Sequence, residues 1–455
     1  MTNRLDSAIF EAFTPVYDDI GDIGGLMVVG KAQMVAEREQ FKLDRHHDPD
    51  LKARDINETA LEEHFVMLRD LKDQLKSVSS PSIRQAYQWR IAELKGGVKT
   101  VRASLQNDWK SYERINNQLY GEFDADFGTA VITYLNNKAS QHIDDASVSV
   151  RAAAEQVMTY CGPLASNISR SVHPSSHEFM TVKKQHGEFY RRLMGDTALP
   201  QVVTVEDRRV MIADMKDKMG VPKDMYPHVP QKEGVKSWSV THTGKGAIRD
   251  PGLDMDSVYY VGLVPGHEVG THVAERLNAM NGPVGLLEYG LPRYLIAGEG
   301  KGTMRQAIAY ETLEQYVDTP RDRLVLKRFA LSAYPRLKAG VGFEEWFGFA
   351  ESLAVLDTLI DDPELTIDEA KDATFIDTFD VIKRANKGGF RRPDGSVVPR
   401  RDDEVYAKGM VEQFSLAANM PGYVDYADQG KLNLADPINV AWAQEWGILP
   451  KLLVQ

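Results

Sequence analysis

The chain has 455 residues with a formal net charge of −12, 43% hydrophobic and 26% charged residues, an ordinary balance for a globular protein with a full core. The excess negative charge disfavours a nucleic-acid partner, because binding phosphates requires a concentrated basic surface. No stretch approaches the roughly 18 apolar residues that span a bilayer, and the N-terminus lacks the pattern of a signal peptide. The single cysteine, Cys161, excludes an internal disulfide and a thiolate metal cluster. We therefore expect a cytoplasmic protein with neither a membrane nor a nucleic-acid partner.

The first third of the chain has the pattern of helices. Apolar residues recur at intervals of three and four on either side of Pro81, which is the spacing of one helix face. Thr59 followed by Glu62 predicts a capping box at the start of the first of these helices. The pair Gly96-Gly97 predicts that the second helix ends or loosens there. We expect both stripes to form helix-on-helix core contacts.

The middle of the chain changes in composition. Residues 161–176 are rich in Gly, Pro, Ser and His, which predicts a loop. Residues 201–204 and 237–243 carry β-branched and aromatic side chains between turn formers, which predicts short strands. Helical patterns return after Gly282. The sequence therefore predicts an α+β fold that is mostly helical.

The segment most informative about chemistry spans residues 266–272, where His267 and His272 stand five positions apart with Glu268 beside the first. Neutral imidazole is a preferred zinc ligand, and catalytic zinc sites keep one position open for water. In an ideal α-helix a separation of five turns the second ring about 140° away from the first. Both rings can face one metal only if the helix takes an extra residue as a π-bulge, which Gly270 makes less costly. The alternative is two histidines satisfied within a packed helix.

Two histidines need a third ligand, and glutamate is the usual choice in zinc peptidases. The downstream candidates are Glu275, Glu288, Glu299, Glu311 and Glu314. Glu275 is too close to fold back on the same helix, whereas Glu299 lies between two glycines that permit a close approach of the backbone. We favour Glu299, and the residues alone leave the later candidates open.

The sequence resembles a family of zinc metallopeptidases, that of microtubule-associated tyrosine carboxypeptidase, whose bacterial relatives carry the QEGLA signature. Matching motifs follow the family's order along about half of the chain. In the metal segment and after it they are His267-Glu268-Val269-Gly270-Thr271-His272, Asn278, Gly290-Leu291 and Glu299-Gly300. Nearer the C-terminus they are Arg384, Gly388-Gly389, Asp402-Asp403 and Tyr406-Ala407-Lys408-Gly409. One departure is Lys301-Gly302, where the family has Leu-Ala, and this puts the packing behind the metal segment in question.

The resemblance implies the organisation of the chain and a ligand set. It implies a zincin-like catalytic domain over residues 196–455, with a helical C-terminal part, after a helical N-terminal region over residues 1–195. It implies that the two histidines and Glu299 bind one Zn²⁺ per chain. It also implies that Glu268 activates the water on the metal.

Hydrolysis of a peptide bond requires further groups. Glu268 would take a proton from the water and return it to the leaving amine. The oxyanion needs a second stabiliser, for which Tyr406 is the candidate, with His242 behind it. A carboxypeptidase also needs an arginine to bind the terminal carboxylate bidentately. Arg384 is our first choice and Arg401 the reserve.

We therefore expect a zinc-dependent metallopeptidase, a carboxypeptidase that acts on the C-terminus of a peptide or protein. The alternative is a zinc-binding protein of the same fold that is inactive or acts on a non-peptide amide. The intact Glu268 argues against an inactive scaffold, which has no need of a carboxylate beside the water. Residues 237–243 are a further hypothesis, an edge strand that binds substrate backbone by strand addition. The sequence leaves the oligomeric state open.

Overall fold

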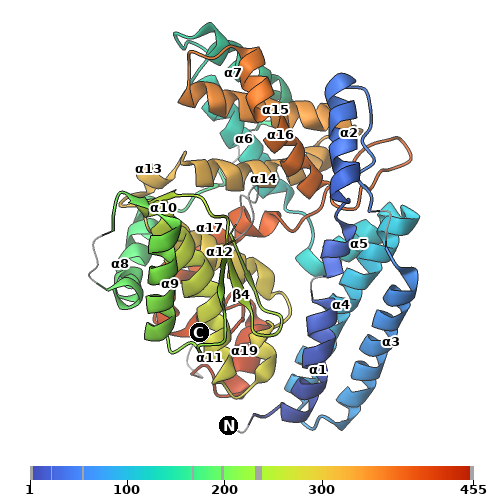
Figure 1. Ribbon diagram of the computed structural model, residues 1–455, viewed down its shortest axis with the longest axis vertical. Helices are drawn as coiled ribbons and strands as arrows, with labels where there is room; N and C mark the ends of the chain where they lie inside the picture. Colours follow the sequence, from blue (N-terminus) through green and yellow to red (C-terminus); the bar gives the residue numbers. More distant parts are fainter. Residues whose placement is uncertain are drawn as a thin grey trace.

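The computed structural model describes residues 4–21, 23–53, 56–166, 169–195, 199–230 and 238–450, and most of them lie in helices. Figure 1 shows three groups of elements: an N-terminal wing on the right, an upper helical group, and a central group that carries the short strands. The prediction of a mostly helical α+β fold is confirmed. Among these described residues, no helix has both the length and the apolar character needed to cross a membrane.

The N-terminal wing consists of α1 (Ser7–Ile20), η1 (Ile23–Met27), α3 (Glu58–Gln74), η2 (Leu75–Ser77), α4 (Pro81–Gln106) and α5 (Trp109–Tyr120). The predicted capping box at its second long helix is wrong, because the Asn57 side chain caps α3 by accepting from the Thr59 and Ala60 N–H groups. The predicted end at Gly96-Gly97 is also wrong, since α4 continues through both glycines. A Cβ on Gly96 would lie 3.3 Å from a Leu119 methyl group, so glycine permits the close contact between α4 and α5.

The upper helical group consists of α2 (Lys31–Leu43), α6 (Ala125–Ser140), α7 (Val148–Cys161), η3 (Gly162–Leu164), α14 (Pro320–Leu337), α15 (Phe343–Asp361) and α16 (Ile367–Ala385). Its core joins distant parts of the sequence. The Phe41 ring of α2 lies edge-on to the rings of Phe343 and Phe347 on α15. Of the loop predicted over residues 161–176, residues 161–164 belong to α7 and η3, and residue 176 begins the next helix. Residues 165–166 and 169–175 form the loop between them, and residues 167–168 lie outside the described residues.

The central group consists of α8 (Ser176–Met194), α9 (Val205–Lys218), α10 (Ser257–Val261), η4 (Gly262–Val273), α11 (Ala274–Met280), η5 (Gly285–Glu288), α12 (Tyr294–Ala307), α17 (Glu404–Asn419), α18 (Tyr423–Tyr426) and α19 (Pro437–Glu445). The short α13 (Leu313–Tyr316) connects it to α14. Helix α12 packs between η4 and α17 in the middle of this group.

The strands are short: β1 (Val202–Val203), β2 (His228–Pro230), β3 (Ser239–Thr241), β4 (Ala247–Asp250) and β5 (Met255–Asp256). β1 pairs antiparallel with β5, and a second sheet has the order β2-β4-β3 with β2 parallel and β3 antiparallel to β4. The strand predicted over 201–204 corresponds to β1. The one predicted over 237–243 corresponds to β3, which lies at the edge of its sheet, and its first residue, Ser237, lies outside the described residues.

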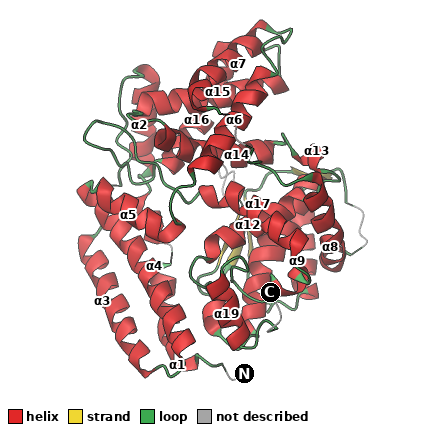
Figure 2. Ribbon diagram, turned by 180° about the vertical axis from the view of Figure 1, so that it is seen from behind, coloured by secondary structure: helices red, strands yellow, loops and turns green. Residues whose placement is uncertain are grey.

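Two large hydrophobic cores each combine early and late parts of the chain. In one, Phe13 and Tyr87 of the wing share a cluster with Leu286 and Trp442 of the central group. Figure 2 shows, from behind, the wing standing beside the central group with the upper helices above both. The expected division at residue 195 stays a prediction.

Candidate metal centre

The two histidines lie on η4, a π-helix over Gly262–Val273. In a π-helix each N–H donates to the carbonyl five residues earlier, so positions i and i+5 lie above one another. The distortion predicted from the sequence is therefore present, extended over the whole segment. It brings His267 and His272 onto one face, with ring centres 5.0 Å apart.

Gly270 is required by this geometry. A Cβ on Gly270 would lie 2.0 Å from the carbonyl oxygen of Pro265 and 2.6 Å from the ring of Phe189. Pro265 lacks an N–H and so removes one donor from the helix interior. The Thr271 hydroxyl donates to the carbonyl of Gly266 at 2.8 Å and supplies a bond across the same widened turn.

Glu299 reaches the two histidines from α12. One of its oxygens lies 3.3 Å from Nε2 of His267, and the other lies 3.8 Å from Nε2 of His272. All three donor atoms lie within 4.8 Å of one another. Bonds of about 2.0–2.2 Å from a tetrahedral zinc would separate its ligand atoms by about 3.3–3.6 Å, close to these distances. Among the described residues, this is the one group of three or more His, Cys, Asp or Glu side chains that could hold a metal ion.

Helix α12 also fixes the ring of His267. A Cβ on Gly302 would lie 2.7 Å from that ring, so the glycine lets the imidazole pack directly on the helix. Nδ1 of His267 faces the Gln306 side-chain oxygen at 3.3 Å. If Nδ1 donates to this oxygen, Nε2 is left as an acceptor facing Glu299, which is the tautomer that a metal ligand needs.

A glycine contact brings Tyr406 to the same centre. A Cβ on Gly300 would lie 2.4 Å from the backbone of Gly409, so α12 and α17 cross almost backbone to backbone. Glu299 precedes the first of these glycines, and Tyr406 lies three residues before the second. The Tyr406 hydroxyl consequently donates a hydrogen bond to the Glu299 carboxylate.

The protonation states of these groups suit a metal site. Burial lowers the pKa of His272 to about 3, so the ring is neutral near pH 7. Burial acts to raise the pKa of Glu299, but the adjacent histidines and the Tyr406 hydroxyl lower it overall to about 2. Neutral imidazole and ionised carboxylate are the forms that bind a divalent cation.

Glu268 lies beside the three donors and is itself buried. Burial raises the pKa of its carboxyl, and the negative charge of Glu299 raises it further. The charges of His267 and Arg321 and a hydrogen bond from the Val240 backbone act in the opposite direction. Since Val240 lies on β3, the edge strand borders the carboxyl group.

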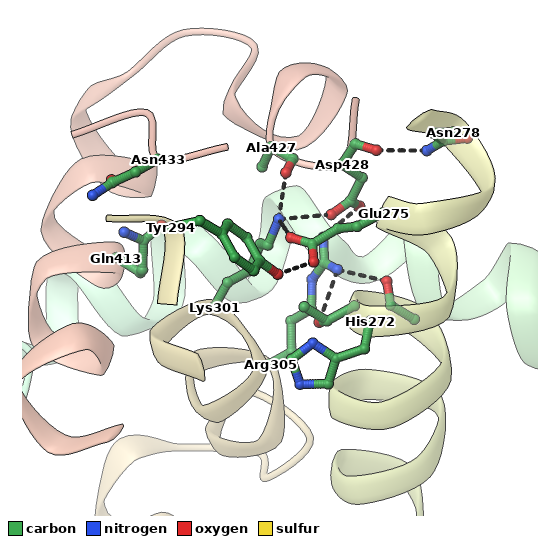
Figure 3. A network of polar contacts seen from close by, with 12 residues as sticks. His272, Glu275, Asn278, Tyr294, Lys301, Arg305, Gln413, Ala427, Asp428 and Asn433 are labelled. Atoms are coloured by element: carbon green, nitrogen blue, oxygen red, sulfur yellow. Dashed lines mark hydrogen bonds and ion pairs between the residues drawn. The ribbon is translucent and has the colours of Figure 1, made fainter. Parts of the chain in front are cut away.

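A buried network of charged side chains supports the backbone of η4 (Figure 3). Arg305 of α12 donates to the Gly270 carbonyl at 2.7 Å and to the Thr271 hydroxyl at 3.1 Å. It also donates to Asp428 at 2.7 Å. The Gly270 carbonyl lies on the distorted turn between the two histidines, and a buried carbonyl needs such a partner.

Lys301, which stands where the resemblance would predict a leucine, belongs to the same network. Its side chain is 3% exposed, and its ammonium pairs with Glu275 and with Asp428. It also donates to the Ala427 carbonyl, while the Tyr294 hydroxyl donates to Glu275. Glu275, one of the alternative third ligands, is thus engaged by Lys301 and Tyr294.

The predicted oxyanion stabilisers both border the centre. Tyr406 does so through its bond to Glu299, and burial raises the pKa of its hydroxyl. The ring of His242 lies edge-on to that of His272, with centres 6.1 Å apart. Tyr226 holds the other side of this ring, with its hydroxyl 2.9 Å from Nδ1. Burial lowers the pKa of His242 well below its ordinary value, so the ring is neutral near pH 7.

The two predicted carboxylate-binding arginines already have protein partners. Arg384 pairs with Asp403, its Nη2 lying 2.6 Å and its Nε 2.9 Å from the same carboxylate oxygen. Arg401 donates to Glu404 at 2.9 Å, to the Asn117 side chain at 3.1 Å and to the Glu122 carbonyl at 3.2 Å. With 3% of its side chain exposed, Arg401 would have to release these partners to reach a substrate.

Lys431 lies near the centre, although no pattern in the sequence predicts it there. Lys431 is 4% exposed, and burial together with the charges of Arg276 and Arg90 lowers the pKa of its ammonium to about 7. Its charge acts on both His272 and His242. It comes from a loop far from the histidines in the chain, and no spacing rule connects the two.

Comparisons with known proteins add little to this geometry. No family model matches the chain, and no curated protein is similar to it in sequence. A solved structure described as Pyrococcus furiosus carboxypeptidase in an apo-Mg form aligns over 99% of this chain and 94% of that chain, at 14% identity and a TM-score of 0.27. The resemblance to the tyrosine carboxypeptidase family accordingly stays a prediction.

Proposed function

We propose that the chain is a zinc-dependent metallopeptidase that binds one Zn²⁺ through His267, His272 and Glu299. The observation that carries the proposal is the convergence of two Nε2 atoms and both oxygens of one carboxylate at a single point, where His267 is buried and the other two side chains are partly buried. Two histidines and a glutamate, with a fourth position open, are a donor set of catalytic zinc sites in peptidases. A zinc ion in this position supplies a Lewis acid that polarises a carbonyl and lowers the pKa of a water toward about 7.

Glu268 carries the proton transfers. Its carboxylate takes a proton from the water that attacks the scissile carbonyl carbon. It returns that proton to the amine nitrogen as the C–N bond breaks. The burial that raises the pKa of Glu268 strengthens it as a base, and its position beside His267 brings it within reach of the reacting water.

Tyr406 and His242 complete the site as donors to the oxyanion. The Tyr406 hydroxyl, hydrogen-bonded to Glu299, lies at the edge of the metal centre. When Tyr226 donates to Nδ1 of His242, the ring proton sits on Nε2 and is available to a developing negative charge. Both groups act in a buried environment, where such bonds are stronger than in water.

The substrate is a peptide whose backbone lies along the edge strand β3. Among the described strands, β3 pairs with β4 alone, and its Val240 backbone lies against Glu268. A peptide added to this edge would cross the metal centre next to the base. A zinc protein without turnover would need no base beside the water, and an enzyme acting on a non-peptide amide would need the base but not the strand.

The test combines metal analysis with a digest of diverse peptides read by mass spectrometry. We expect about one zinc per native chain and peptides shortened by single residues. Glu268→Gln should keep the zinc and lose hydrolysis by about 100-fold to 10,000-fold, the usual contribution of a general base. Full turnover by a zinc-loaded Glu268→Gln protein would contradict the assigned base. A zinc-loaded native protein that cuts no peptide would favour the inactive or non-peptide alternative.

A further inference from the structure

Two arginines of α14 lie near Tyr406, the residue that bonds to Glu299. Arg321 and Arg328 are seven residues apart on this helix and therefore lie two turns apart on one face. The Arg321 guanidinium lies 5.9 Å from the centre of the Tyr406 ring. Its charge also acts on Glu268. The face of α14 that carries both arginines is thus directed at the reacting groups.

Neither arginine has an acidic partner. Among the described residues, no ion pair or hydrogen bond is made by either guanidinium, and Nε of each is buried without a partner. Arg323 of the same helix differs, since it pairs with Asp361 at 2.9 Å. A half-buried guanidinium without a partner is unfavourable, because burial removes its water and nothing replaces it.

The surroundings add positive rather than negative charge. Burial, together with the charges of Arg384 and Arg321, lowers the pKa of Arg328 to about 10. The nearby carboxylate of Asp403 raises the pKa of Arg328, but it is already paired with Arg384. Among the described residues, Arg384 is thus held by a carboxylate, whereas Arg321 and Arg328 lie near carboxylates without an ion pair to any of them.

The position of these two arginines indicates which anion they would bind. When a peptide is cut before its last residue, the α-carboxylate belongs to the residue that follows the scissile carbonyl. The Cα atoms of these two residues are about 3.8 Å apart. The scissile carbonyl must lie beside Glu268, and Arg321 lies beside both Glu268 and Tyr406. A planar carboxylate matches the fork of a guanidinium and can be held between two of them.

We propose that Arg321 and Arg328 bind the free α-carboxylate of the substrate's last residue and so make the enzyme a carboxypeptidase. The inference rests on the proposed peptidase function. It gives the recognition of the chain end to α14, in place of the paired Arg384 and the enclosed Arg401. Arg384 then acts by orienting Asp403 and by adding positive charge.

The experiment uses the full zinc-loaded chain and peptides of the form N-acetyl-Ala-Ala-X, with X as Phe, Leu, Glu or Lys, each as free acid and as C-terminal amide. We expect the native enzyme to cut the acids about 100-fold more efficiently than the amides. Arg321→Gln and Arg328→Gln should each lower kcat/KM for the acids by about 30-fold or more, mainly through KM, since removing one partner of a charged pair is costly. The ratio of the acid rate to the amide rate should fall toward one, because this ratio is insensitive to any effect that the lost Arg321 charge has on Glu268. The lysine substitutions should recover part of the loss, because they keep the charge and lose the fork.

Arg323→Gln is the matched control on the same helix and should behave as the native enzyme. Equal rates on acids and amides in the native enzyme would overturn the inference, and so would an acid preference that survives in both glutamine variants. If only the peptides ending in Glu are preferred, as acid and amide alike, the site binds an acidic side chain and the inference also fails. Circular dichroism checks that each variant is folded.

A binding measurement separates this inference from the proposed function. Calorimetric titration of the Glu268→Gln protein with the same peptides should give acids bound about 30-fold more tightly than amides, a difference lost when Arg321→Gln is added. This result supports the carboxylate site even if no peptide is cut, in which case only the peptidase proposal fails. Equal binding of acids and amides contradicts the carboxylate site.

Discussion

Buried charge governs the behaviour of single residues around the metal centre. The Lys301 ammonium is held by Glu275 and Asp428 in a region closed to solvent. Removing one partner of such a buried pair typically costs about 3–5 kcal/mol, because the other charge is left without compensation. The residue at 301 is therefore coupled to both carboxylates and cannot be exchanged alone for an apolar side chain. The neighbouring position 302 requires glycine for another reason, because the ring of His267 packs where a Cβ would lie.

His186 lies beneath this network and should make stability depend on pH. Burial and the charges of Arg305 and Lys301 lower the pKa of its ring to about 3. Between that value and the ordinary pKa of about 6.5, the unfolded chain binds a proton that the folded chain does not. The free energy of unfolding must therefore fall as the pH falls through this window. From pH 7 to pH 5, this one ring should contribute a loss of about 2 kcal/mol.

Urea unfolding of the native protein and of His186→Gln at both pH values measures this contribution. The loss between pH 7 and pH 5 should be about 2 kcal/mol smaller in the variant. His177→Gln, an exposed position on the same helix, serves as the control and should keep the native dependence. The same loss in His186→Gln as in the native protein would show that the ring is not held neutral.

At the scale of elements, the π-helix η4 is the feature on which the site depends. Gly270→Ala places a Cβ 2.0 Å from the Pro265 carbonyl, a contact that the backbone must move to relieve. We expect a loss of about 3 kcal/mol or more in the free energy of unfolding. We also expect weaker zinc binding, because the turn between His267 and His272 changes. Chemical denaturation and zinc titration measure the two effects.

Gly187→Ala is the matched control for this substitution. Gly187 lies inside α8, and a Cβ there would meet nothing within 4 Å. Alanine should raise the free energy of unfolding by about 0.5–1 kcal/mol, as expected in a helix interior, without affecting zinc. A Gly270→Ala protein that is as stable and binds zinc as tightly as Gly187→Ala would contradict the role given to η4.

Local chemistry explains which elements could be predicted from the sequence. Pro81 marks the start of α4, since a proline at the first helical position acts within one turn. The helix end predicted at Gly96-Gly97 was wrong because the effect of these glycines depends on residues of another element that pack on them. The π-helix was predicted because the spacing of two histidines on one segment is itself a local quantity.

At the scale of the whole molecule, the site combines segments that only the fold brings together. Glu299 could be favoured from its glycine neighbours, but Arg321, Arg328 and Lys431 reach the centre from other elements and follow no motif. Their importance lies in missing partners and in burial, which are properties of the assembled structure. The two cores, which join early and late parts of the chain, likewise have no signature in any single segment.

The net charge of the whole molecule differs in sign from the local charge near the metal centre. The formal charge of −12 argues against a polyanionic partner for the molecule as a whole. The arginine face of α14 is a local exception of opposite sign, directed at the metal centre. A substrate's chain end can therefore be attracted to the site by a protein that is acidic overall.

A crystal structure of the zinc-loaded chain, with an anomalous difference map recorded at the zinc absorption edge, tests the central claim most directly. We predict one strong peak per chain at about 2.0–2.2 Å from Nε2 of His267, Nε2 of His272 and a carboxylate oxygen of Glu299. A map with no peak there, or with the two imidazoles directed into separate surroundings, would contradict the account.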